Sequence, residues 1–406
     1  MNKNSRRVLS VILVLYLFLF GVQRSYGESK PYLVVISLDG FRNDYPETVH
    51  LPTFDSLARV GVKAEFLKSA FPSSTFPNHY TIATGLYPDH QGIVANNFYD
   101  PKLNRHFSVI DPVAVRDPAF YGGEPVWLTA EKQGVKTASF FWVGSETPIN
   151  GNYPTYWKKY DQKTSFSARV DTLLHWLSLP EDKRPHLVFF YYHEPDASGH
   201  KYGPESKEMK DCLIDLDHKM ADLTKKLKEL PIFSNIDIIV LSDHGMASTS
   251  PDRTVNLNAF LSLSWFSHIK GSSPVLLFKV KPEYNEKAFQ ALKKIPHCRV
   301  WKSRKMPPEL HYGKNPRTLD IVLLADNGWS IKLREDDPIQ AGSHGYDPDN
   351  SNMHAIFYAS GPSFKKGYTA KWLNTVDIYP LITRLLHINP EKVDGTIKQG
   401  IDILKQ

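Results

Sequence analysis

The sequence predicts an α/β protein with a mostly parallel central sheet that helices cover on both faces. Strand-like and helix-like patterns alternate along the chain from residue 31 onward, which is typical of this class. The strand-like runs are almost continuously apolar, as expected for strands buried on both faces. Asp and His residues directly follow several of these runs, at the position where open α/β sheets bind their ligands.

The elements follow from the spacing of apolar residues. Apolar, β-branched runs predict strands at Tyr32–Leu38, Thr137–Val143, His186–Tyr192, Ile236–Leu241, Val275–Val280, Asp320–Leu324 and Ala355–Ala359. The clearest helix spans Glu205 to Leu230, where apolar residues recur every three or four positions before Pro231. Shorter helices are predicted at Thr53–Val60, Pro77–Thr84, Glu286–Lys294 and Thr375–Leu386. No repeat or interdomain linker interrupts this alternation, so residues 28–406 are expected to form a single domain.

Residues 1–27 have the features of an export signal. Basic residues precede an apolar run from Val8 to Val22, and Ser25 and Gly27 supply the small side chains that suit cleavage. The run is shorter than the roughly 18–20 residues of a membrane-spanning helix. We therefore expect a cleaved signal peptide, with an uncleaved signal anchor as the alternative. In both cases the rest of the chain is exported, to the periplasm or beyond.

The net charge of +6 belongs largely to this N-terminal segment. Residues 1–27 contain four basic residues and no acidic one, so their removal leaves 45 basic and 43 acidic residues, a net charge of +2. The remainder gives no indication of a nucleic-acid-binding surface. The two cysteines, Cys212 and Cys298, are too few for a disulfide framework or a cysteine-based zinc site. Whether they pair with each other stays open.

Three Asp and three His residues lie in four loops that one sheet edge would bring together. The set comprises Asp39, Asp196, His200, Asp243, His244 and His344. Each residue alone has an ordinary explanation, such as a turn aspartate or a structural histidine. Together they form an oxygen and nitrogen ligand set that suits zinc, with iron or manganese as poorer alternatives. Six ligands divide into two sites of three, an arrangement that suits in-line phosphoryl displacement.

A run of hydroxyl side chains supplies the candidate nucleophile. Ser73, Ser74 and Thr75 are consecutive, and Pro77 suits the first turn of a helix. This places Thr75 just ahead of a helix N-terminus, where free N–H groups and the helix dipole favour a phosphate and an alkoxide. We expect Thr75 to be the nucleophile, with Ser74 as the local competitor. The alternative is that these hydroxyls only cap the helix.

These residues belong to six motifs whose order resembles that of a known family. The motifs are Leu38-Asp39-Gly40-Phe41-Arg42, Thr75-Phe76-Pro77-Asn78-His79-Tyr80, Thr84-Gly85-Leu86-Tyr87-Pro88, Glu194-Pro195-Asp196-Ala197-Ser198-Gly199-His200, Ser242-Asp243-His244-Gly245-Met246 and His344-Gly345-Tyr346. Over roughly residues 31–400 the chain resembles the nucleotide pyrophosphatase/phosphodiesterase family of the alkaline phosphatase superfamily, in its single-domain bacterial form. The resemblance implies an alkaline-phosphatase-like sandwich and a hydrolase of the phosphodiesterase I type, which releases nucleoside 5′-monophosphates.

The resemblance also implies roles for individual residues. Thr75 is expected to form a covalent threonyl-nucleotide intermediate and to contact one of two Zn²⁺ ions. The ligands implied for one ion are Asp196, His200 and His344, and those for the other are Asp39, Asp243 and His244.

The substrate-binding residues come from the same comparison. Asn96 resembles the asparagine that donates a hydrogen bond to a phosphate oxygen, with the adjacent Asn97 as the alternative. Phe76 and Tyr160 resemble the two aromatic residues between which a base stacks, an interaction that tolerates every base. Glu146 stands where the family has another acidic residue, and its contact is left open.

The expected partners are small nucleotides, with no binding of duplex nucleic acid and with membrane contact only through an uncleaved N-terminal segment. Two alternatives lie within the superfamily: a phosphomonoesterase, and a general or phospholipid-type phosphodiesterase. The neutral donor Asn96 favours a diester over a dianionic monoester. A third alternative, of another class, is a metal-binding protein without catalytic activity.

Overall fold

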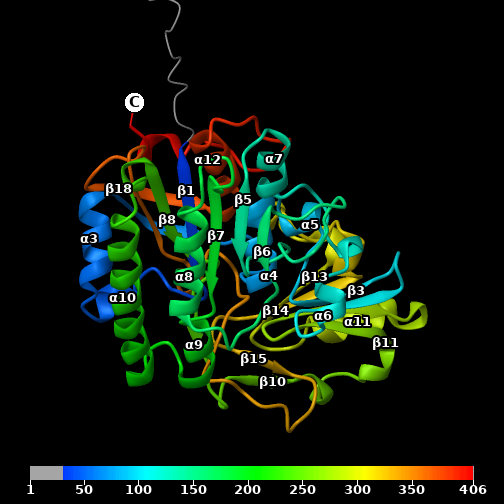
Figure 1. Ribbon diagram of the computed structural model, residues 1–406. Helices are drawn as coiled ribbons and strands as arrows, with labels where there is room; N and C mark the ends of the chain where they lie inside the picture. Colours follow the sequence, from blue (N-terminus) through cyan, green and yellow to red (C-terminus); the bar gives the residue numbers. More distant parts are fainter. Residues whose placement is uncertain (1–30, 406) are drawn as a thin grey trace, which may run out of the picture. The chain divides into compact units, whose positions relative to one another are not determined.

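The computed structural model describes residues 31–405, so the export signal predicted for residues 1–27 lies outside the described residues (Figure 1). Residues Pro31–Gln406 form one compact unit. Within the described range, no helix is both long and apolar enough to cross a membrane.

An eight-stranded sheet forms the centre of this unit. In spatial order its strands are β18 (Tyr368–Asn374), β2 (Val62–Lys68), β17 (Phe357–Ser360), β8 (Ile236–Leu241), β1 (Tyr32–Leu38), β7 (Leu187–Tyr192), β5 (Thr137–Phe140) and β6 (Tyr156–Lys158). Every strand except β17 runs in the same direction. The predicted α/β class with a mostly parallel sheet is therefore confirmed.

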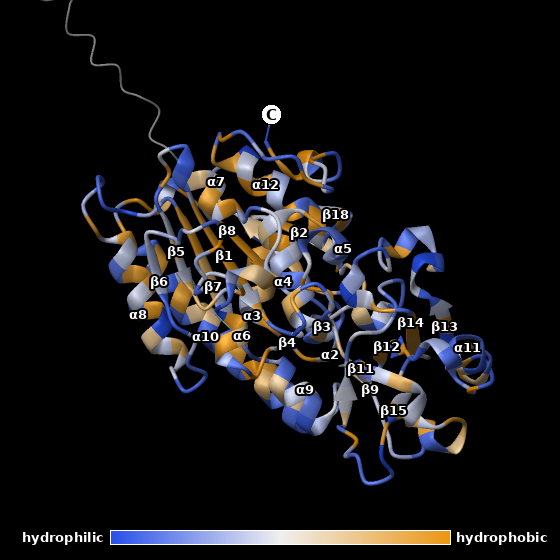
Figure 2. Ribbon diagram, turned by 90° about the vertical axis from the view of Figure 1, so that its right-hand side faces the viewer, coloured by the Kyte–Doolittle hydropathy of each residue, from blue (hydrophilic) through white to orange (hydrophobic). Residues whose placement is uncertain are grey.

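Two groups of helices cover the sheet (Figure 1). One group consists of α3 (Pro52–Val60), α8 (Phe166–Leu177) and α10 (Lys207–Lys228), and the other of α4 (Thr75–Thr84), α7 (Val126–Lys132) and α12 (Ile378–Leu385). Because helices cover both faces, β1 and β8 are buried along their whole length. Hydrophobic residues accordingly concentrate in the central strands (Figure 2).

The long helix α10 confirms the prediction made from its apolar spacing. It begins after Ser206, whose Oγ accepts a hydrogen bond of 3.0 Å from the backbone N–H of Met209. Its buried residues include Leu213, Leu216 and Met220, which lie on one face. The N-terminal cap satisfies a backbone donor that the helix itself leaves free.

A second sheet contains two strands that the apolar runs suggested for the central sheet. This antiparallel sheet has the order β11 (Phe266–Ser272), β12 (Val275–Val280), β14 (Ile321–Ala325) and β13 (Cys298–Lys302). Apolar residues of this sheet and of α11 (Asn285–Leu292) pack together in a second apolar core. The prediction of one shared sheet was wrong here, because an apolar run shows that a strand is buried but not which strand it pairs with.

The two cysteines are free thiols in this structure, and each is partly buried. Burial raises the pKa of both the Cys212 and the Cys298 thiol to about 12. Both side chains therefore stay in the unreactive thiol form at neutral pH.

Candidate active site

Four chain segments bring the six predicted ligands to the carboxyl-terminal edge of the central sheet. Asp39 follows β1 and Asp243-His244 follows β8, while Asp196 and His200 lie on α9 (Asp196–Tyr202), after β7. His344 follows the short strand β16 (Gly342–Ser343). In each of two groups of three, the ligand atoms lie within 4.8 Å of one another. These groups are the first cluster (Asp196, His200 and His344) and the second cluster (Asp39, Asp243 and His244).

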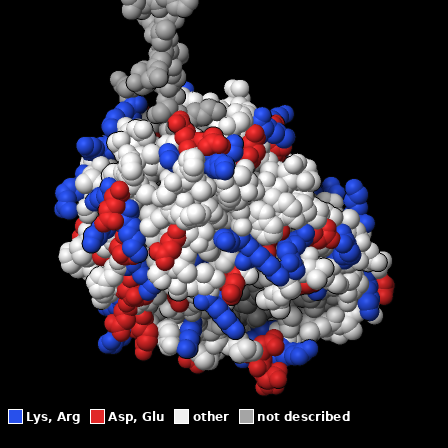
Figure 3. Space-filling view, viewed as in Figure 1, with Lys and Arg blue, Asp and Glu red and all other residues white. Residues whose placement is uncertain are grey.

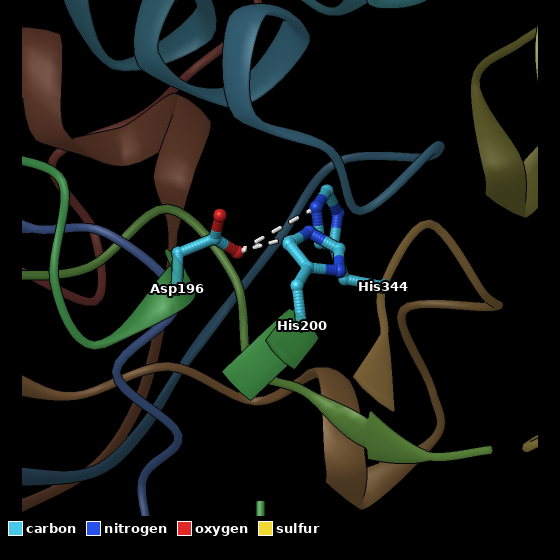
Figure 4. Close-up of side chains that lie close together, drawn as sticks. All are labelled: Asp196, His200 and His344. Carbon is cyan, nitrogen blue, oxygen red and sulfur yellow. Dashed lines mark ion pairs between the residues drawn. The ribbon is translucent and has the colours of Figure 1, made fainter. Parts of the chain in front are cut away.

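The first cluster is organised around one carboxylate oxygen. Oδ1 of Asp196 lies 3.5 Å from Nε2 of His200 and 3.6 Å from Nε2 of His344. Figure 4 shows both imidazole rings directed at this carboxylate. Asp196 and His200 are four residues apart on α9, so they project from the same helical face.

The second cluster is completely buried. Nε2 of His244 lies 3.0 Å from Oδ2 of Asp243 and 3.5 Å from Oδ1 of Asp39. The rings of His244 and His344 stack with their centroids 3.7 Å apart, so the two clusters are in direct contact.

All three histidines are oriented by a backbone carbonyl. The Nδ1–O distances are 2.9 Å for His200 to Gly342, 2.8 Å for His244 to Gly245 and 3.0 Å for His344 to Ser73. An Nδ1–H that donates to each carbonyl leaves the lone pair of Nε2 directed into the clusters. Metal-binding histidines are held in this way, because the second hydrogen bond fixes both the tautomer and the ring.

The aspartates of the clusters have oxygens that no hydrogen bond from the described residues satisfies. These buried atoms are Oδ1 of Asp39, Oδ1 of Asp196 and Oδ2 of Asp243. Burial, together with the charges of Asp243 and Asp196, raises the pKa of Asp39 well above its usual value. Buried carboxylate oxygens without a hydrogen bond are costly, and a bound cation would compensate them. The residues present therefore fit a pair of metal ions.

Thr75 lies at the second cluster. Its Oγ1 is 3.2 Å from Nε2 of His244. Thr75 is the first residue of α4 and Ser74 is the N-cap. The helix therefore begins two residues before the predicted start at Pro77, and Thr75 lies within its first turn instead of just ahead of it. Pro77 takes the third helical position, where a missing N–H also costs nothing because the first turn has no internal acceptor.

Asn96 is held beside the start of α4. Its Oδ1 accepts a hydrogen bond of 3.0 Å from the backbone N–H of Phe76, which leaves its amide NH₂ group as a donor. The carboxamide of Asn97 is used elsewhere, because its Nδ2 donates to the carbonyl oxygen of Gly271 at 2.8 Å. The two adjacent asparagines therefore make different contacts.

The two predicted stacking residues lie in different aromatic groups. Phe76 packs edge-on against Phe107 with ring centroids 5.9 Å apart. Tyr160 is 42% exposed and packs edge-on against Phe141 at 5.2 Å. Glu146 accepts a hydrogen bond from the backbone N–H of Tyr160, and burial raises the pKa of the Glu146 carboxyl.

Two site residues were not identified from the sequence. Nδ1 of His79 lies 2.9 Å from the carbonyl oxygen of Thr75 and 3.3 Å from Oδ2 of Asp243. The hydroxyl of Tyr191 donates a hydrogen bond of 2.6 Å to Oδ2 of Asp39. The available signal for His79 was its position four residues after Thr75 on the same helical face.

Comparison with known proteins places the chain in a family. Residues 33–347 match the family model described as type I phosphodiesterase / nucleotide pyrophosphatase. The chain belongs to this family. This assignment confirms the resemblance found in the sequence motifs.

Members of the type I phosphodiesterase / nucleotide pyrophosphatase family resemble the chain over most of its length. A venom phosphodiesterase of Crotalus durissus collilineatus is 38% identical over 376 residues, which cover 90% of this chain and 45% of the venom protein. The chain thus spans about half the length of that relative. The bis(5′-adenosyl)-triphosphatase ENPP4 of Bos taurus is 38% identical over 379 residues, which cover 92% of this chain and 82% of the bovine protein.

Solved structures of the family share the fold. Murine ectonucleotide pyrophosphatase/phosphodiesterase 5 superposes with a TM-score of 0.89 at 34% sequence identity, covering 92% of this chain and 100% of the murine chain. An inactive threonine-to-alanine variant of the murine protein was solved in complex with AMP, with the same TM-score and coverage.

Proposed function

We propose that this protein is a zinc-dependent hydrolase of phosphodiester and pyrophosphate bonds in nucleotides and their derivatives, and that it releases nucleoside 5′-monophosphates. The observation that carries the proposal is the position of the Thr75 hydroxyl, 3.2 Å from His244 at the first residue of α4 and beside two clusters of metal-ligand type. The names of the relatives, which include phosphodiesterases and a bis(5′-adenosyl)-triphosphatase, support the same reaction class.

The two clusters would hold two Zn²⁺ ions, one each. Asp and neutral His side chains in sets of three are the usual ligands of catalytic zinc, where a fourth position stays open for substrate. Bound there, the ions would lower the pKa of hydroxyl groups and water and would neutralise charge on phosphoryl oxygens.

Thr75 would act as the nucleophile. A bond forms between its Oγ1 and phosphorus, the bond from phosphorus to the leaving oxygen breaks, and that oxygen leaves as an alcohol or a phosphate. Water then hydrolyses the threonyl-nucleotide, which releases the monophosphate and restores the threonine. The threonine-to-alanine variant of murine ectonucleotide pyrophosphatase/phosphodiesterase 5, described as inactive, supports this role.

The groups around Thr75 would bind the transferred phosphate and its nucleoside. The NH₂ group of Asn96 is available to donate to a phosphate oxygen, and the N-terminus of α4 favours the same negative charge. Phe76 and Tyr160 would provide the faces for base stacking, which contributes roughly 1–3 kcal/mol per base.

The export of the protein is part of the same proposal. Residues 1–27 would act as a signal peptide or signal anchor, and residues 28–406 would be the single catalytic domain. Nucleotides outside the cytoplasm would then be the substrates.

Comparing three nitrophenyl substrates tests the proposed reaction. We expect the zinc-loaded protein to hydrolyse a nitrophenyl nucleotide ester far faster than nitrophenyl phosphate or nitrophenyl phosphocholine. Thr75→Ala is expected to abolish turnover while its zinc content stays the same, and Ser74→Ala is expected to remain active. Full activity of Thr75→Ala would rule out the nucleophile, and a preference for the phosphocholine ester would favour the phospholipid-type alternative.

A further inference from the structure

A cavity of about 200 Å³ lies against the first cluster. His200 and His344 of that cluster contribute to its wall, as do Asn96 and Ser74 near the start of α4. Ser272, the last residue of β11, closes another side next to the turn that leads to β12, so the second sheet contributes to the site.

Hydrogen bonds hold the cavity wall around Ser272 on both of its sides. Asn97 donates to the carbonyl oxygen of Gly271, and Oγ of Ser273 accepts a hydrogen bond of 2.8 Å from the backbone N–H of Ile331. The residues on both sides of Ser272 are thus held by hydrogen bonds, one to Asn97 beside Asn96 and one to Ile331 on β15 (Ser330–Lys332). The cavity is therefore a preformed part of the site.

Its position relative to Thr75 indicates which part of a substrate it receives. Thr75 Oγ1 lies at the second cluster, 3.2 Å from His244, whereas the cavity is lined by the first cluster. In an in-line displacement the attacking and leaving oxygens lie on opposite sides of phosphorus, and two metal sites serve one oxygen each. A phosphorus atom attacked by Thr75 thus directs its leaving oxygen toward the first cluster and the cavity.

The cavity wall also indicates the chemistry of that group. Apart from the two cluster histidines, its polar side chains are neutral, namely the hydroxyls of serines such as Ser272 and the carboxamides of Asn96 and Gln340. Hydroxyls and carboxamides both donate and accept, which suits the hydroxyl groups of a sugar or polyol. Polyphosphates are instead typically bound by arginine or lysine, whose charge compensates the loss of solvation.

The volume of the cavity also favours a small leaving group. Sites for whole drug-sized molecules typically begin at about 300 Å³. A cavity of about 200 Å³ accommodates a group of roughly one ring.

We propose that this cavity is the leaving-group site and that it selects substrates whose leaving group is an uncharged, hydroxyl-bearing unit such as a nucleoside or polyol. Nucleotide diesters are then preferred relative to substrates that release pyrophosphate. This inference rests on the proposed function and specifies its substrate class.

Two substrates that transfer the same 5′-AMP group test the proposal. ATP releases pyrophosphate, and the 3′–5′ dinucleotide ApA releases adenosine. The ratio of kcat/KM for ATP to that for ApA is measured in the zinc-loaded wild type and in Ser272→Lys and Gln340→Lys. Both positions are exposed, so a lysine is compatible with the fold. Ser267→Lys, at an exposed position on β11 outside the cavity, is the matched control.

We expect a lysine at either cavity position to raise the ATP-to-ApA ratio at least tenfold over wild type, and Ser267→Lys to leave it within twofold. A rise in either cavity variant without a rise in the control supports the assignment. An unchanged ratio in both variants, or an equal rise in the control, overturns it while leaving the proposed function intact. If the wild type hydrolyses neither ATP nor ApA, the proposed function is overturned, and this inference with it.

Discussion

The hydroxyl of Tyr191 donates a hydrogen bond of 2.6 Å to Oδ2 of Asp39. Burial holds the pKa of this phenol well above its usual value, so Tyr191 remains a donor at every physiological pH. Asp39 Oδ2 is thereby engaged, and Oδ1 is the oxygen left for a cation. Tyr191 is a positioning residue of the second cluster.

Tyr191→Phe is expected to weaken zinc binding by about 10–100-fold, the usual effect of losing a hydrogen bond to a metal ligand. Titration of the metal-free protein with zinc measures this change directly. Excess zinc should restore most of the activity, because the substitution removes no ligand. Tyr192→Phe is the matched control on the same strand, and equal zinc affinity in the two variants would contradict the role of Tyr191.

Removing the proposed zinc ions is expected to destabilise the fold as well as abolish activity. The chelated protein retains three buried carboxylate oxygens without a hydrogen-bonding partner. A ligand at about 1,000 times its Kd stabilises the folded state by about 4 kcal/mol. Calorimetry should therefore show a lower Tm after chelation and a return of Tm with added zinc.

The same calorimetric measurement can include a control for the identity of the metal. Magnesium added to the chelated protein should restore little of the Tm, because a cluster that includes histidine nitrogen suits zinc better than magnesium. A Tm that does not respond to chelation would show that the clusters are empty in solution.

Asn96→Asp separates the two functions of that side chain. The carboxylate still accepts the hydrogen bond from the backbone N–H of Phe76, so the start of α4 stays intact. The amide donor that we propose for a phosphate oxygen is lost, and a negative charge takes its place. We expect kcat to fall by about 100–1,000-fold, the range for loss of one donor to a developing oxyanion.

Asn97→Ala provides the comparison for Asn96. Its carboxamide contacts Gly271 and not the start of α4. This variant should lose much less activity than Asn96→Asp when both are measured with a nitrophenyl nucleotide ester. The reverse order would assign the phosphate donor to Asn97.

The meeting of the predicted ligands at the carboxyl-terminal edge of the central sheet was predictable, because it depends on local sequence. The strand Tyr32–Leu38 was predicted with correct ends, since a fully apolar run stops abruptly at Asp39-Gly40. Asp243-His244 follows β8 in the same way. Parallel strands have their carboxyl ends at one edge, so these loops had to meet.

The features that the sequence did not predict depend mainly on which strands pair and in which register. Tyr191 reaches Asp39 only because β7 pairs with β1 in a register that places it opposite Ser37, and no local pattern specifies that register. The strand β2 was missed because Lys63 and Glu65 interrupt its apolar residues, which alternate on a partly exposed strand.

Tyr160→Ala tests the nucleoside-binding role that we propose for this aromatic residue. Loss of base stacking, worth roughly 1–3 kcal/mol, should raise KM for a nitrophenyl nucleotide ester by about 5–150-fold with little change in kcat. Bis(nitrophenyl) phosphate has no nucleoside, so its hydrolysis should be almost unaffected. Tyr153→Ala is the control variant, because Tyr153 is 40% exposed and stacks on Trp157. Equal losses with both substrates would show that Tyr160 supports the structure of the site instead of binding the base.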